Sequence, residues 1–149
     1  MSSDPEIAAI AHVIQLAVAP VFLLTGVGAL LAVMTNRLAR VIDRARALEA
    51  QFASLDEVAR AAARVELGVL AKRARLASWA INFCTFAALL VCTEIALLFI
   101  DAFIGTNLKW AVGALFVVAM AALIGGLVSF LREVYLATHT LRIGPPPHN

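Results

Sequence analysis

The fold is decided by residues 36–75, which read NRLARVIDRARALEAQFASLDEVARAAARVELGVLAKRAR and separate two long apolar runs. This stretch holds nine of the chain's twelve lysine and arginine residues, against five acidic residues. Lysine and arginine gather in the loops of membrane proteins that stay in the cytoplasm. The stretch therefore predicts a cytoplasmic connection between two membrane-spanning helices, and it sets the expected orientation of the whole chain.

The composition supports a membrane protein independently of this stretch. Of the 149 residues, 62% are hydrophobic and only 15% are charged, whereas soluble domains carry about 25% charged residues. Three segments are apolar enough and long enough for a hydrocarbon core of about 30 Å, at 10–34, 77–103 and 110–131. We predict a single all-α membrane domain over 1–149, with three transmembrane helices, the N-terminus outside and a cytoplasmic tail at 132–149.

The cytoplasmic stretch is expected to form an antiparallel helical hairpin. Residues 36–53 contain no proline or glycine, so the first helix should continue out of the membrane. Ser54 followed by Glu57 matches a capping box, which predicts Ser54 as the N-cap of the returning helix. A set of apolar residues could form a seam between the two arms or between subunits: Val41, Leu48, Phe52, Leu55, Val58, Val65, Val69 and Leu76.

Glu94 is a carboxylate inside the second predicted span. Counting 1.5 Å per residue from Trp79 places it about 22 Å up the hydrocarbon core, in its outer third. His12 and Gln15 fall in or just above the same layer. Glu94 could line a water-filled path or bind a cation. Alternatively, it could be a structural acid that is hydrogen-bonded to Gln15 or Thr93, or that reaches the outer interface.

Arg37, Arg40 and Arg44 lie on one stripe of the first helix at the level of the inner headgroups. Two functional interpretations stay open, namely recognition of anionic lipid headgroups and a positively charged vestibule. A third interpretation is that the arginines only determine topology and face solvent.

Small residues and titratable residues give further expectations. Ala121, Gly125 and Ser129 follow the small-xxx-small spacing that allows helices to approach closely, so they indicate packing. Cys84 and Cys92 are expected to be apolar core residues. No cluster of histidine and cysteine has the spacing of a metal site, and we predict no metal, no cofactor and no nucleic-acid partner.

Three blocks carry a resemblance to a known family: QLAVAPVFLLTG at 15–26, NRLARVIDRAR at 36–46 and FLREV at 130–134. They resemble a small bacterial inner-membrane family that is catalogued as a domain of unknown function. The resemblance spans nearly the whole chain. It implies a three-helix domain in the bacterial cytoplasmic membrane, and it brings no activity, cofactor or catalytic residue.

These patterns lead to two functional hypotheses. The first is a homo-oligomer that conducts or senses an ion, because the small-residue faces, the hairpin seam and Glu94 all call for partners that one subunit hardly supplies. The second is a non-catalytic scaffold in which the hairpin docks a partner. We predict that the chain is not an enzyme, because it shows no nucleophile with a base, no metal set and no phosphate loop.

Overall fold

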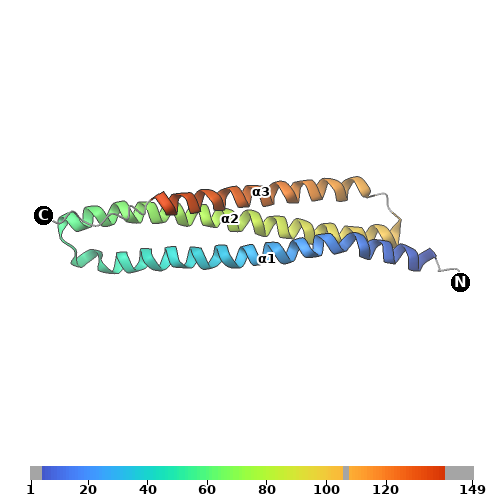
Figure 1. Ribbon diagram of the computed structural model, residues 1–149, viewed down its shortest axis with the longest axis horizontal. Helices are drawn as coiled ribbons and strands as arrows, with labels where there is room; N and C mark the ends of the chain where they lie inside the picture. Colours follow the sequence, from blue (N-terminus) through green and yellow to red (C-terminus); the bar gives the residue numbers. More distant parts are fainter. Residues whose placement is uncertain (1–4, 106–107, 140–149) are drawn as a thin grey trace.

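Three long helices make up the fold in a computed structural model, which describes residues 5–105 and 108–139. Helix α1 spans Pro5–Gln51, α2 spans Glu57–Ile104 and α3 spans Lys109–His139. A single 3-10 turn, η1 at Phe52–Ser54, joins α1 to α2. The helices run side by side along one axis, and the α1–α2 end projects beyond the end of α3 (Figure 1).

All three helices are long and apolar enough to cross a membrane, judged by length and composition. At 1.5 Å per residue, α1 and α2 are each about 70 Å long, more than twice the thickness of a hydrocarbon core. The predicted continuation of the first helix beyond residue 34 is confirmed, because α1 runs through Pro20 and Asn36 without a break. Helix α3 runs past the predicted end at Leu131, so the first part of the predicted tail is helical. Residues 140–149 lie outside the described residues.

The predicted N-cap of the returning helix is wrong. Asp56 is the N-cap of α2, and its Oδ1 accepts a hydrogen bond of 2.8 Å from the backbone N–H of Ala59. The hydroxyl of Ser54 instead donates to the carbonyl of Gln51 and closes the 3-10 turn. The negative charge of a carboxylate at this position is also stabilised by the positive end of the helix dipole, and a serine carries no such charge.

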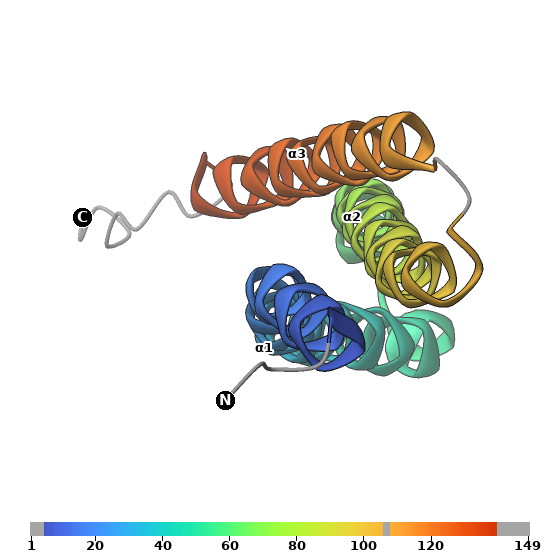
Figure 2. The same ribbon diagram turned by 90° about the vertical axis from the view of Figure 1, so that its right-hand side faces the viewer.

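Helix α2 is the central helix, and it packs against both α1 and α3 (Figure 2). Buried residues recur at intervals of seven along each helix. The series are Val13, Pro20, Val27, Met34 and Val41 in α1, Ala63, Leu70, Ala77, Cys84 and Val91 with Ala80, Ala87 and Glu94 in α2, and Ala119, Gly126 and Glu133 in α3. Ala17 of α1 is also buried, outside these series. A seven-residue repeat is typical of helices that pack in a left-handed coil.

The centre of the bundle is apolar and is built from small residues on α2. Val27 and Met34 of α1 pack against Ala80 and Cys84 of α2. A Cβ added to Gly126 of α3 would lie 2.6 Å from the sulfur of Cys84, so α3 approaches α2 closely at this glycine. Only part of the predicted apolar set lies between the two arms of one chain, and a seam between subunits stays a prediction. Val41 is buried, whereas Val58 and Val65 are 81% and 71% exposed and cannot join the two arms.

Candidate functional site

Glu133 ties the three helices together at one level of the bundle. Although it carries a carboxylate, it occupies a core position of α3 and is only 1% exposed. Arg73 of α2 donates to Glu133 Oε1 from both Nη2 and Nε, at 3.0 and 3.2 Å. Arg37 of α1 approaches from the other side, with Nη2 at 3.0 Å from Oε2. The Arg37 contact lacks hydrogen-bond alignment, so it is an ion pair alone. One carboxylate thus holds a guanidinium from each of the other two helices.

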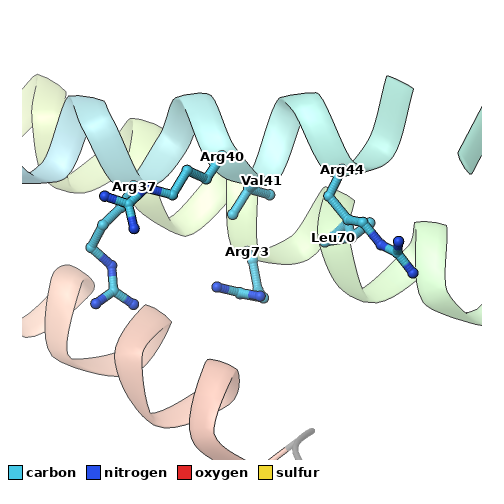
Figure 3. Close-up of a pocket in the computed structure, with 6 residues that line it drawn as sticks. All are labelled: Arg37, Arg40, Val41, Arg44, Leu70 and Arg73. Carbon is cyan, nitrogen blue, oxygen red and sulfur yellow. The ribbon is translucent and has the colours of Figure 1, made fainter. Parts of the chain in front are cut away.

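An arginine pocket lies next to this ion pair. Its volume is about 330 Å³, and it is lined by Arg37, Arg40, Val41, Arg44, Leu70 and Arg73. In Figure 3, Arg37 and Arg73 come from α1 and α2, and Arg40 extends along α1 toward Arg37. Val41 and Leu70 are buried and form an apolar floor. Four arginine side chains therefore line one small cavity.

The predicted stripe of Arg37, Arg40 and Arg44 lines this pocket, and the structure adds Arg73 and Glu133. Arg44 pairs with Glu66 of α2 at 2.8 Å, and both side chains of that pair are well exposed. Arg37 also lies over the ring of Phe130, with its guanidinium carbon 5.4 Å from the ring centroid. Glu133 carries a signal in the sequence, because it follows Gly126 by seven residues and comes just after the uncharged run that ends at Leu131.

A second polar site lies near the opposite end of the bundle, and we call it the outer cavity after the orientation that the sequence predicts. Its volume is about 470 Å³, and all three helices contribute to it. Its polar lining residues are His12 of α1, Glu94 and Asp101 of α2, and Lys109 of α3. Glu94 is only 6% exposed, and its Oε2 has no hydrogen-bond partner among the described residues. The outer cavity therefore contains a buried carboxylate oxygen that the described part of the protein does not satisfy.

The neighbours proposed for Glu94 from the sequence occupy different places. His12 lines the same cavity as Glu94. Gln15 is exposed, and it is not one of the residues that line the outer cavity. The hydroxyl of Thr93 donates to the carbonyl of Leu89 at 2.9 Å, within its own helix. Asp101 accepts a hydrogen bond of 3.2 Å from the N–H of Leu108, which fixes the turn at the rim of the cavity.

The small residues of the third span do not share one contact. Ala121 is exposed, and Gly125 faces the ring of Phe83, with 3.8 Å between an added Cβ and the nearest ring carbon. Ser129 donates to the carbonyl of Gly125. The close approach is made by the next residue, Gly126. No three His, Cys, Asp or Glu residues in the described part of the chain are grouped so that they could hold a metal ion.

Comparison with known proteins identifies the family. A family model described as "Protein of unknown function (DUF2721)" matches residues 17–143. The chain belongs to this family. The resemblance seen in the sequence is thereby confirmed. The DUF2721 match includes Glu94, Glu133 and all four arginines of the pocket, and it begins after His12 and Gln15. No curated protein and no solved structure matches the chain.

Proposed function

We propose that this protein senses a small cation or a proton from within the bacterial cytoplasmic membrane, and that it acts as a homo-oligomer. The observation that carries the proposal is Glu94, whose Oε2 is buried at a core position without a hydrogen-bond partner among the described residues. A carboxylate costs at least about 2.5 kcal/mol to place within a membrane helix, so it is usually paired or functional. A cation or a proton bound at Oε2 would remove this cost.

The surroundings of Glu94 suit a small ion. His12, Asp101 and Lys109 line the same cavity as Glu94, so this cavity carries polar side chains from all three helices. An ion that binds there contacts α1, α2 and α3 together. Its binding would stabilise one arrangement of the three helices over others, and this preference is what a sensor requires.

Sensing is favoured over conduction by the position of the two polar sites. The outer cavity and the arginine pocket lie toward opposite ends of one subunit. Between them lies the apolar cluster of Val27, Met34, Ala80 and Cys84. A conducting path would therefore have to form between copies of the chain, whereas a sensor needs only the site that each copy contains.

We propose the orientation that the cation distribution indicates, with the N-terminus outside and the hairpin in the cytoplasm. In this orientation the outer cavity faces the exterior and the arginine pocket lies at the inner headgroups. We propose no enzymatic activity, no cofactor and no nucleic-acid partner.

A cation titration tests the sensing function. The full-length protein in detergent is unfolded thermally at several concentrations of sodium, potassium or protons, with choline keeping the ionic strength constant. The wild-type midpoint should rise with the ligand, since binding to the folded state stabilises it, and Glu94→Gln should abolish this response. Glu49→Gln is the control, because Glu49 is an exposed carboxylate on the hairpin. An equal response of wild type and Glu94→Gln for every ligand would rule out the sensor.

The second candidate function is a scaffold that docks a partner through the hairpin. It is supported by the high exposure of Val58 and Val65 on α2, near the end that projects beyond α3. A scaffold needs no ion, so an absent cation response together with normal folding would favour this candidate.

A further inference from the structure

The arginine pocket carries more positive charge than its own contacts neutralise. It is lined by four arginines, whereas only two carboxylates, Glu133 and Glu66, pair with three of them among the described residues. Arg40 is exposed and makes no ion pair with any described residue. The Nε of Arg37 is buried and has no hydrogen-bond partner in the described part of the chain. The pocket thus keeps an excess positive charge and unused hydrogen-bond donors.

The side chains of the pocket are of the kind that binds an oxyanion. Guanidinium groups bind phosphate through paired N–H donors, and they are more weakly hydrated than ammonium groups. The apolar floor of Val41 and Leu70 keeps water from one side of the cavity, which strengthens charge interactions above it. Glu133 holds Arg37 and Arg73 in place from behind, so these two side chains are already ordered before a ligand arrives.

The level of the pocket matches the position of lipid headgroups. Arg37 is the first charged residue after the apolar run of α1, and Glu133 lies two residues after Leu131, at the end of the uncharged part of α3. Their ion pair therefore marks the inner boundary of the apolar spans. We infer that the arginine pocket binds the phosphate group of an anionic lipid headgroup, with Arg40 as a direct ligand and Glu133 as a positioning residue for Arg37 and Arg73. This inference does not depend on the ion-sensing function.

The experiment measures lipid binding to the full-length protein by native mass spectrometry. The probes are dioctanoyl phosphatidylglycerol, dioctanoyl phosphatidylcholine and inorganic phosphate. The wild type should prefer phosphatidylglycerol to phosphatidylcholine. Arg40→Gln should weaken phosphatidylglycerol binding about tenfold, the loss expected for one charge-assisted hydrogen bond. Arg40→Lys should give an intermediate loss, because it keeps the charge and loses the paired donors.

Arg132→Gln is the matched control. Arg132 is an exposed arginine at the same end of the bundle, and it lines a different, mainly apolar groove with Lys72 and Tyr135. It should leave phosphatidylglycerol binding unchanged. If inorganic phosphate binds tightly and Arg40→Gln weakens this binding, the pocket is an oxyanion site whose ligand is free phosphate. This outcome would overturn the lipid headgroup as the ligand. Equal losses in Arg40→Gln and Arg132→Gln, or no loss in Arg40→Gln, would overturn the inference, provided that both variants keep the wild-type thermal midpoint.

Discussion

Two glutamates occupy core positions of the bundle, and their surroundings give them opposite roles. Glu133 contacts Arg37 and Arg73, so its charge is matched by side chains of the same chain. Glu94 is similarly buried, but it makes no ion pair with any residue that the structure describes. A matched buried charge fixes structure, whereas an unmatched one leaves a place for a ligand. At the scale of single residues, we therefore expect Glu133 to serve the framework, and the proposed ion site rests on Glu94.

Replacing Glu133 with glutamine should destabilise the bundle. The substitution removes the negative charge between two guanidinium groups and leaves them to repel each other. Breaking a buried ion pair costs about 3–5 kcal/mol. We expect the lower end of this range, because the Arg37 and Arg73 side chains are 33% and 21% exposed and water can partly replace the carboxylate. The change in the free energy of unfolding can be measured in mixed detergent micelles, with circular dichroism as the signal.

Glu66→Gln is the control for this prediction. It breaks the pair with Arg44, in which the side chains are 60% and 42% exposed, so the loss should stay below about 1 kcal/mol. Similar losses in Glu133→Gln and Glu66→Gln would contradict the structural role of Glu133.

At the scale of the helices, the close packing of α3 on α2 depends on small side chains. Ala77, Ala80, Cys84 and Ala87 line the inner face of α2, and Gly126 of α3 meets this face. In a bilayer, lipid tails are as apolar as leucine side chains, so helices associate through close packing rather than through exclusion from water. The absence of a side chain at Gly126 therefore supports the fold directly.

Gly126→Ala should separate the two helices. Its Cβ would lie 2.6 Å from the Cys84 sulfur and 3.2 Å from the Ala80 carbonyl oxygen, and the backbone oxygen cannot move without shifting α2. Overpacking of this kind costs about 1–3 kcal/mol. The neighbouring Gly125→Ala is the matched control, since its Cβ would make an ordinary contact of 3.8 Å with Phe83. Unfolding in micelles should show a lower free energy of unfolding for Gly126→Ala and not for Gly125→Ala. Equal stabilities of the two variants would show that α2 and α3 can move apart without cost.

The number and type of helices could be predicted from the sequence, whereas the packing faces could not. Long apolar runs and the arginine-rich stretch indicated three helices and the continuous α1. The seven-residue repeat was not visible, because nearly every position of the spans is apolar and hydrophobicity does not separate inward from outward positions. Gly126, Glu94 and Glu133 are not large apolar residues, and these three do mark inward positions. Glu133 was not singled out because its partners lie on two other helices, and only the fold brings them together.

At the scale of the whole molecule, the chain is a pair of long rods with a shorter third helix on one side (Figure 1). Rods of about 70 Å exceed a hydrocarbon core of about 30 Å, so a large part of α1 and α2 must lie outside the membrane. The Arg37–Glu133–Arg73 contacts mark the level at which the apolar part ends. The remaining part of the two rods, with the turn at Phe52–Ser54, forms the projecting hairpin.

Labelling of single engineered cysteines tests the proposed orientation in intact cells. A membrane-impermeant maleimide should leave Gln51→Cys unlabelled until the membrane is permeabilised, because Gln51 ends α1 at the hairpin turn. It should label Thr106→Cys directly, since in the sequence this position falls between the end of α2 at Ile104 and the start of α3 at Lys109, which the proposed orientation places outside. The unmodified chain, with Cys84 and Cys92, measures background labelling. Direct labelling of Gln51→Cys would reverse the orientation and would place the arginine pocket at the outer headgroups.

The ion pair of Glu133 also has a consequence for how the chain is made. Glu133 follows Arg73 by sixty residues, so the ribosome completes both arginines long before their carboxylate exists. Until α3 has been synthesised and inserted, Arg37 and Arg73 stand at the membrane boundary without this partner. A product of interrupted translation that ends before Glu133 never closes the contact. The contact that joins all three helices is therefore one of the last to form, after α1 and α2 are already in place.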